Sequence, residues 1–396
     1  MSNSKELRNK NYIEVIRALF KLKEATKPDI ARRTGLTTVT INAIMGDLAE
    51  RGVCAQTGQA SSNGGRKAVL YKINEAFGYL IGVEINRDSL KIFVFDLSLR
   101  IVYEKDASID YENVSQSIAA MTQHIEEAIS EQKDIPREKY LKIGVTVPGQ
   151  ADRKNGVVTR LPDIKNWNDI PIKMLIENRI KIPVILDNDV NAHTLAAIWN
   201  SLAAKDADMV FVNITSGVGS GIYINGSLFY GANSRAGEIG HATIKYDGPM
   251  CKCGNRGCAE AFVCDDAILG RLGLIEAKAA PNTIDEAISI AKGDPGSRAY
   301  GVFRETADYI AILIDHIVKI YDPRTIIIEN TWLCEIPSLF YHLKDEFFKK
   351  SPWVKQDSLN IIIDKGTSSS VSTGCLALNE LLCEEAVESI FLRRPR

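Results

Sequence analysis

The stretch 249-PMCKCGNRGCAEAF-262 places Cys251, Cys253 and Cys258 within eight residues of a chain that has only eight cysteines. The other five are scattered, so they form no disulfide framework, and thiols kept reduced are free to bind metal. Thiolates spaced Cys-x-Cys-x4-Cys can converge on one tetrahedral ion. His241, ten residues upstream, completes a Cys3His set, with Cys264 as a rival fourth ligand. We therefore predict one structural Zn(II) per chain, which pins an otherwise loose loop.

Composition and charge outline the rest of the chain. Its 396 residues are 45% hydrophobic and 25% charged, which is typical of folded proteins with two or three cores. Residues 1–76 hold 13 Lys and Arg against 7 Asp and Glu, whereas residues 77–396 hold 35 against 43. A basic head on an acidic body favours a polyanionic partner for the head, although a solvated basic face is the commoner explanation.

No part of the sequence is typical of a membrane protein. No apolar run reaches the roughly 18 residues that a membrane helix needs, and the start MSNSKELRNK lacks the apolar segment of a signal peptide. We therefore expect a cytoplasmic protein with no membrane partner.

The head has the pattern of a helix-turn-helix. Residues 12–22 carry apolar side chains at helical spacing. Thr26 and Pro28 predict the start of a second helix, which ends near Arg33. After a turn at Gly35, Thr37 caps a third helix, whose N-terminal residues would meet base edges in the major groove.

Two strands, VCAQTGQ and KAVLYKI, follow around the turn SSNGGR and predict a wing with cations at its return. The alternative is a helical hairpin used for dimerisation. We predict a winged helix-turn-helix over residues 1–76 that binds DNA. The residues predicted to contact DNA are Thr37, Thr38, Thr40, Asn42, Arg66 and Lys67.

The body, residues 77–396, alternates strands and helices. A meander of three strands is followed by a helix and further strands, and the pattern then repeats from about residue 208. This repetition predicts a two-lobed α/β body with a ligand cleft between the lobes.

Two polar stretches of the body are candidates for chemistry. Asn188 and Asp189 lie where the strand IPVILDND runs into a helix, at a carboxyl end of the kind where α/β folds place their sites. The alternative is that Asp187 or Asp189 merely caps the helix. The stretch AGEIGHATI supplies Glu238 and His241.

A winged helix followed by DNDVNA, GEIGH and CKCGNRGCAE resembles the ROK family of sugar kinases and sugar-responsive repressors, in its xylose-repressor and N-acetylglucosamine-repressor branch. The resemblance spans nearly the whole chain and implies a two-lobed actin-like, ribonuclease-H-like fold with a central cleft. It implies lobe one over about residues 77–198 plus a C-terminal helix at 381–396, and lobe two over 199–380. The residues that it implies for the sugar site are Asn188, Asp189, Glu238, His241 and Glu260. His241 would then serve both the zinc and the sugar.

The nucleotide motifs of the kinases are altered in this chain. Their phosphate loop Asp-x-Gly-Gly-Thr corresponds here to residues 84–88, EINRD, which has no glycine and ends in a carboxylate. The second hairpin, TSGVGSG, keeps its glycines, but the adenosine segment carries Glu329 and Asn330 in place of Gly-Gly. We therefore expect no ATP and no catalytic residue, with Asp189 a vestige of the kinase base.

These features predict a sugar-responsive transcriptional regulator, most simply a repressor of carbohydrate-utilisation genes. As a homodimer, or a dimer of dimers, it would bind a palindromic operator in double-stranded DNA, and a monosaccharide such as xylose would release it. One alternative is a DNA-binding sugar kinase with weak ATP use, and another is a regulator that binds no ligand.

Overall fold

The computed structural model describes the chain in two compact units. Unit 1 comprises residues 1–192 and 371–396, and unit 2 comprises residues 193–370. The described residues are 2–60, 67–87, 89–162, 164, 166–200, 208–273, 283–366, 369–383 and 387–392. Within these ranges, no helix combines the length and the apolar character needed to cross a membrane.

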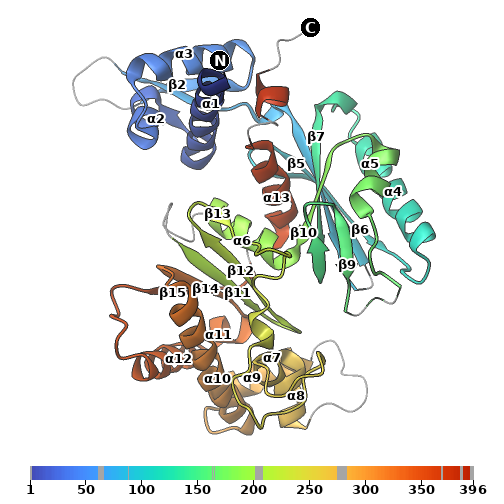
Figure 1. Ribbon diagram of the computed structural model, residues 1–396, viewed down its shortest axis with the longest axis vertical. Helices are drawn as coiled ribbons and strands as arrows, with labels where there is room; N and C mark the ends of the chain where they lie inside the picture. The colour runs from blue at the N-terminus through green and yellow to red at the C-terminus, as the bar shows by residue number, and fades with distance from the viewer. Residues whose placement is uncertain are drawn as a thin grey trace. The chain divides into compact units, whose positions relative to one another are not determined.

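The head is a three-helix unit with a small sheet (Figure 1). Its elements are α1 (Ser2–Leu22), β1 (Ala25–Thr26), α2 (Lys27–Thr34), α3 (Thr38–Glu50), β2 (Cys54–Gln59) and β3 (Val69–Ile73). Helix α1 begins ten residues before the predicted start at residue 12, in a polar stretch that the apolar pattern could not reveal. The predicted caps are confirmed, since Thr26 forms a capping box with Asp29 and Thr37 accepts a hydrogen bond from the Thr40 N–H. The strands pair in the order β1-β3-β2.

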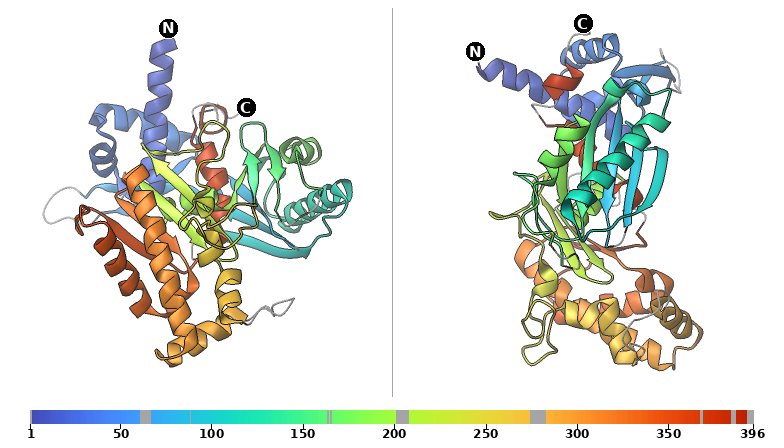
Figure 2. Two further views of the ribbon diagram at one scale, coloured as in Figure 1. Left: turned by 60° about the horizontal axis from the view of Figure 1, so that its bottom comes forward. Right: turned by 90° about the vertical axis from the view of Figure 1, so that its right-hand side faces the viewer.

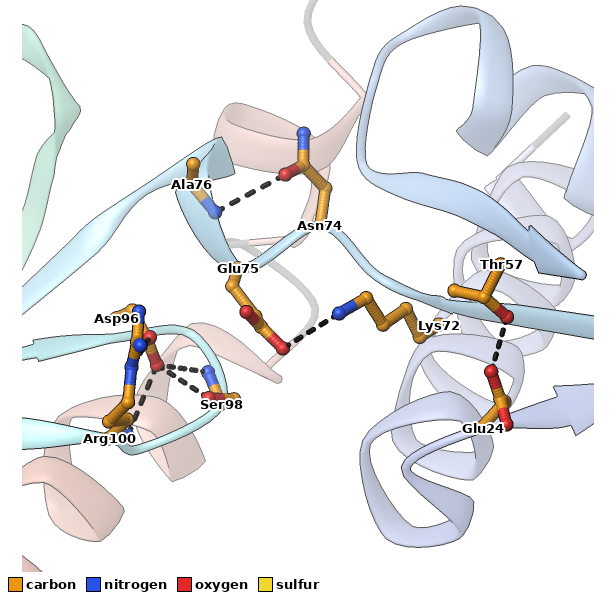
Figure 3. Close-up of polar contacts among 9 residues, drawn as sticks. All are labelled: Glu24, Thr57, Lys72, Asn74, Glu75, Ala76, Asp96, Ser98 and Arg100. Atoms are coloured by element: carbon orange, nitrogen blue, oxygen red, sulfur yellow. Dashed lines mark hydrogen bonds and ion pairs between the residues drawn. The ribbon is translucent and has the colours of Figure 1, made fainter.

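A short 3-10 turn, η1 (Glu75–Phe77), joins the head to the first strand of the body (Figure 3). Asn74 caps this turn through the Ala76 N–H, and Lys72 forms an ion pair with Glu75 at 3.1 Å. The Leu97 N–H donates to the Glu75 carbonyl, so the turn is also fixed to the loop after the second body strand. The junction is therefore held by contacts on both sides and is not a free linker.

Unit 1 is built on a five-stranded sheet in the order β10-β7-β4-β5-β6. Strands β4, β5 and β6 form the antiparallel meander that the sequence predicted, and the two further predicted strands, β7 and β10, extend it in parallel. Helices α4 and α5 pack on one face of this sheet, and α13 packs on the other (Figure 1). The remaining bounds in this unit are β4 (Tyr79–Ile85), β5 (Ser89–Asp96), β6 (Ile101–Ser108), α4 (Val114–Glu131), η2 (Arg137–Lys139), β7 (Tyr140–Val147), β8 (Gln150–Asp152), β9 (Val157–Arg160), α5 (Ile172–Ile180) and β10 (Val184–Asn188), with α6 (Asp189–Trp199) crossing into unit 2.

The last helix differs from its expected position. We expected a C-terminal helix at 381–396 and assigned the residues before it to lobe two. The structure places α13 at Ser372–Leu381, followed by a π-helical turn, η5 (Val387–Phe391), and groups both with unit 1. The cause is a close fit to the sheet, since a Cβ on Gly82 would lie 2.1 Å from Thr373 Oγ1 and a Cβ on Gly144 would lie 2.3 Å from the Thr373 carbonyl oxygen. The treatment of residues 1–76 as a separate domain stays a prediction.

The sheet of unit 2 has the order β13-β12-β11-β14-β15. It matches the sheet of unit 1 taken from β6 to β10, so β11 corresponds to β4 and β14 corresponds to β7. Helix α10 packs beside α12, and both belong to the core that covers this sheet (Figure 2). The bounds are β11 (Met209–Ile214), β12 (Val218–Ile224), β13 (Ser227–Leu228), η3 (Ile239–His241), α7 (Glu260–Val263), α8 (Asp265–Leu272), α9 (Thr283–Gly293), α10 (Arg298–Tyr321), β14 (Thr325–Glu329), α11 (Thr331–Glu335), α12 (Pro337–Lys350), β15 (Asn360–Asp364) and η4 (Ser369–Val371), which ends across the boundary with unit 1. The predicted repetition of the α/β pattern is confirmed.

Candidate metal centre and ligand-binding residues

The three loop cysteines and His241 converge in unit 2. One ligand atom from each of the four lies within 4.8 Å of the others. Cys251 Sγ is 3.7 Å from His241 Nδ1, and Cys253 Sγ is 3.7 Å from Cys258 Sγ. Two sulfurs bound to one tetrahedral zinc at the usual bond length lie about 3.8 Å apart, so the spacing fits that ion. Cys264, the rival ligand, is not in this group of four.

The loop that carries the cysteines folds back on itself through backbone contacts. The Cys251 N–H donates to the Asn255 carbonyl at 2.8 Å, and the Gly257 N–H donates to the Pro249 carbonyl at 2.9 Å. Gly257 has φ +73°, and a Cβ there would lie 1.7 Å from the Lys245 carbonyl oxygen. The glycine before Cys258 therefore lets the two arms of the loop cross closely enough to bring the thiols together.

His241 is positioned by the GEIGH stretch. Its last three residues, Ile239–His241, form η3, which lies against β12. A Cβ on Gly237 would lie 2.0 Å from the Ser220 carbonyl oxygen, and a Cβ on Gly240 would lie 2.2 Å from that of Val218. Both glycines are therefore needed for the close approach that aims His241 Nδ1 at the cysteine loop.

The thiols differ in acidity. Burial raises the pKa of the Cys258 thiol to about 12 and also raises the pKa of Cys251. A hydrogen bond from the Asn255 backbone lowers the pKa of Cys253. Because metal binds thiolates, a cation must supply the free energy that deprotonates the two buried thiols.

Glu260 lies between the cysteine loop and the β11–β12 hairpin. Its Oε2 accepts a hydrogen bond from the Val218 N–H at 3.2 Å, and Cys251 Sγ lies 3.8 Å from its Oε1. Glu260 is the first residue of α7, directly after the loop that ends at Cys258. Its carboxylate position therefore depends on the fold of that loop. Glu238, the remaining candidate of this unit, is exposed.

In unit 1, Asn188 ends β10 and Asp189 begins α6. Asn188 Oδ1 accepts from the Val190 N–H at 2.9 Å, and its Nδ2 donates to the Gly149 carbonyl at 2.9 Å. Asp189 Oδ1 also accepts from the Val190 N–H, at 2.8 Å. Asn188 Oδ1 also accepts from the Asn191 N–H at 3.4 Å, so the side chain at the start of this helix that occupies the capping position is Asn188. Asp189 is the first residue of the helix, and Asp187 is a buried strand residue.

The altered nucleotide segments carry acidic or bulky groups. The Asn86 N–H donates to the Ser89 carbonyl at 2.9 Å, and Asp88 lies outside the described residues. Glu329 is buried at the end of β14, where its Oε2 lies 3.2 Å from His193 Nδ1.

The sequence analysis missed Asp265, which begins α8 and whose N–H donates to the Thr215 carbonyl in the β11–β12 turn. Burial raises the pKa of Asp265 to about 6. The pair of aspartates that follows Cys264 was the available signal.

The predicted DNA-contacting residues lie in the head. Thr38 and Asn42 are exposed on α3, and Val39 beside them is 79% exposed. The Thr37 and Thr40 hydroxyls lie 2.9 Å apart at the start of this helix. Lys67 is exposed before β3, whereas Arg66 lies outside the described residues.

Comparison with known proteins supplies the relatives of this fold and site. The xylose repressor of Caldicellulosiruptor bescii is 27% identical over 390 residues, which cover 96% of this chain and 97% of that repressor. The DNA-binding transcriptional dual regulator NagC of Escherichia coli K12 is 29% identical over 265 residues, or 66% of this chain and 64% of NagC.

Solved structures share the fold at lower identity. A ROK family transcriptional regulator, a homologue of the E. coli MLC protein, has a TM-score of 0.77 at 22% identity and covers 96% of this chain and 99% of its own. The ROK hexokinase of Thermus thermophilus has a TM-score of 0.64 at 21% identity and covers 76% of this chain and 99% of its own. The model of the ROK family matches residues 80–346. This chain therefore belongs to the ROK family.

Proposed function

We propose that the protein is a sugar-responsive transcriptional regulator, a repressor that releases its operator when a monosaccharide binds. The observation that carries the proposal is the union in one chain of a helix-turn-helix head with an exposed α3 face and a ROK body. Similarity to a xylose repressor over 96% of the chain supports the same reading.

The DNA contacts proposed for the head follow from exposure and chemistry. Thr38 and Asn42 are exposed on α3, and an asparagine amide can pair with an adenine edge in the major groove. Thr37 and Thr40 stabilise the start of the helix by capping, and their hydroxyls are proposed to contact DNA there. Lys67, with Arg66, is proposed to contact phosphates from the wing.

The proposed sugar ligands are polar groups of the kinds that bind hydroxyls. Glu238, His241 and Glu260 are the candidates in unit 2, and Asn188 and Asp189 are the candidates in unit 1. Carboxylates accept hydrogen bonds from sugar hydroxyls. A metal on His241 Nδ1 would leave Nε2 as an N–H donor, because coordination fixes the tautomer.

The proposed metal is a structural Zn(II) held by His241, Cys251, Cys253 and Cys258. The donor set and its 3.7 Å spacings support this choice. The ion would hold the cysteine loop together, and so keep His241 and Glu260 in place.

A regulator that has lost kinase activity is favoured over a sugar kinase. Asp265 lies beside Thr215 in the hairpin that would hold phosphate, and Glu329 is buried at the strand end that would face adenosine. Carboxylates at these positions oppose the binding of a polyanionic nucleotide. Asp189 would then serve only as an acceptor for a sugar hydroxyl.

The test is operator affinity measured with and without sugar. A binding site is first selected from random duplex DNA with the full chain, and its affinity is then measured by fluorescence anisotropy with xylose, glucose or N-acetylglucosamine. We expect one sugar to weaken binding about tenfold or more, in line with typical couplings between sites. No change with any sugar would remove the proposal, and sugar-dependent release of ADP from ATP would favour the kinase.

A matched pair of variants tests the head in the same assay. Asn42→Ala should weaken binding to the selected site by about 1–3 kcal/mol, as loss of one base-specific contact does. Asn360→Ala, at an exposed position of β15, is the control and should bind like the native chain. Equal affinity of the two variants would exclude Asn42 from the interface.

A further inference from the structure

Arg153, which follows β8, contacts two acidic residues that lie far apart in the sequence. Its Nε lies 3.4 Å from Asp187 Oδ2 in β10, and its Nη2 lies 2.5 Å from Glu380 Oε2 in α13. The Asp187 side chain is only 3% exposed, so its charge depends on a nearby cation. Arg153 thus joins the end of strand β10 to the last turn of α13 within unit 1.

Asp187 in turn holds the residue that follows it. Its Oδ1 accepts from the Asn188 N–H at 2.8 Å and from Asn191 Nδ2 at 2.8 Å. Asn188 is a proposed sugar ligand, and its amide already contacts Gly149 and the start of α6. Asn188 is thus linked through Asp187 to the cation of Arg153.

The chain beyond Glu380 contacts the head. The Leu382 carbonyl accepts from Arg17 Nη2 of α1 at 3.2 Å, and the Leu392 carbonyl accepts from Arg51 Nη1 at 2.9 Å. Phe391 stacks on Phe77 of the junction, with ring centroids 5.6 Å apart. Glu388 Oε2 also accepts from Asn9 Nδ2 of α1 at 3.3 Å. The described parts of the C-terminal segment, which spans residues 382–392, thus contact both the head and the junction.

Arg51 is the attachment that bears on DNA binding. It caps the C-terminus of α3, and its Nη2 lies 2.9 Å from Asp47 Oδ1 of the same helix. Asp47 also accepts a hydrogen bond from the Tyr12 hydroxyl of α1 at 2.8 Å. The segment therefore contacts the helix whose opposite end is proposed to meet base edges.

We propose that Arg153 is a positioning residue that couples the proposed sugar ligands after β10 to the DNA-binding head, through Glu380 and the C-terminal segment. The coupling rests on the proposed function, because it names the route by which sugar alters operator affinity. Close packing of α13 on Gly82 and Gly144 holds the body of that helix on the sheet. The position of the last turn of α13, and of the C-terminal segment beyond it, is therefore the feature that depends on the contact with Arg153.

The test compares Arg153→Gln, Glu380→Gln and Arg137→Gln in the full chain. Arg137 is the matched control, since it forms an ion pair with Glu126 in the same unit, away from these contacts. The measurement is the ratio of operator dissociation constants with and without saturating sugar, using whichever of xylose, glucose and N-acetylglucosamine affects the native chain. Because the sugar is saturating, a change in sugar affinity in a variant does not alter this ratio.

We expect the ratio to fall from about tenfold or more to within about threefold in Arg153→Gln and Glu380→Gln, and to be unchanged in Arg137→Gln. The double variant should lose no more than Arg153→Gln alone, because Glu380→Gln removes an interaction that Arg153→Gln already removes. Arg153→Lys, which keeps the charge, should restore part of the response. Glu380→Gln leaves the pair of Arg153 with Asp187 in place, so it tests the coupling even if Arg153→Gln lowers the melting temperature.

The outcomes separate the coupling from the function on which it rests. A native chain that responds to sugar, together with Glu380→Gln and folded Arg153→Gln variants that respond equally, would overturn the coupling alone. A native chain that ignores all three sugars would overturn the proposed function and the coupling together.

Discussion

The two five-stranded sheets share one strand order but differ in the size of the side chains on their corresponding strands. In unit 1, glycines in β4 and β7 let α13 lie against the sheet at distances that a methyl group would forbid. In unit 2, the strands at the same places in the order, β11 and β14, carry bulky buried side chains such as Phe211 and Ile327. The same topology thus presents strand glycines to a closely packed helix in unit 1, whereas the corresponding strands of unit 2 present bulky buried side chains.

The close packing of glycine serves a different purpose in unit 2. There Gly237, Gly240 and Gly257 each bring a loop against a carbonyl oxygen, and the loops deliver His241 and the cysteines. Glycine in unit 1 seats the helix that precedes the C-terminal segment, whereas glycine in unit 2 assembles the candidate metal centre. The comparison indicates that two sheets with one strand order differ in where glycine lets another segment approach the backbone.

Removing one candidate metal ligand should have the largest effect, because it disrupts a cluster that, among the described residues, lies in unit 2. Cys253→Ser should lose zinc and the sugar response together, since metal binding in such sites contributes on the order of 10 kcal/mol to local folding. Operator binding without sugar should persist, because the head belongs to unit 1. Metal content by mass spectrometry and operator affinity by anisotropy measure the two effects.

Cys264→Ser is the matched control for that experiment. Cys264 is buried near the loop but lies outside the group of four candidate ligands. It should keep one zinc per chain. Zinc retained by Cys253→Ser and lost by Cys264→Ser would reverse the assignment of the ligands.

A methyl group on one strand glycine tests the close packing of α13 in unit 1. Gly144→Ala places a Cβ 2.3 Å from the Thr373 carbonyl oxygen, so the free energy of unfolding should fall by about 3 kcal/mol, as overpacking of a core does. Gly301→Ala, in α10 of unit 2, meets no atom within 4 Å and should raise it by up to about 1 kcal/mol. Urea unfolding of both variants gives the comparison, and equal shifts would show that α13 is not closely packed.

Features that depend on residues close together in the sequence were predicted better than features that depend on contacts between distant segments. The caps at Thr26 and Thr37 and the spacing of the three cysteines depend on residues a few positions apart, so the sequence alone revealed them. The repeated meander was also predicted, because the strands and helices alternate along the chain. The pairing of His241 with the loop came from the family resemblance and the chemistry of zinc.

Features set by packing between distant segments were not predicted. Helix α13 is buried on nearly all sides, so its sequence STGCLALNEL lacks an amphipathic period, and its position depends on glycines more than 200 residues earlier. The contacts of Arg153 with Asp187 and Glu380 likewise join three separate segments. No spacing within one segment could have indicated either arrangement.

The smallest expected effect comes from the half-buried carboxyl group of Asp265 in unit 2. Burial raises the pKa of Asp265 from the ordinary 3.8 to about 6, so the folded state disfavours the ionised form. Above pH 6 the group is ionised in both states, and the folded state bears the full cost. As the pH falls from about 6 toward 3.8, the folded state takes up the proton first and that cost is relieved.

Asp265→Asn removes the charge and should therefore stabilise the protein at pH 7.5 by about 2 kcal/mol, allowing for the exposed part of the group. The gain should fall to about half of that at pH 5.0, because the native carboxyl is then largely protonated when folded. Asp266→Asn, at the exposed neighbouring position, removes a smaller contribution to the same pKa shift and should therefore give a smaller gain at pH 7.5. A gain in Asp265→Asn that did not depend on pH would show that packing, and not the buried charge, limits stability beside Thr215.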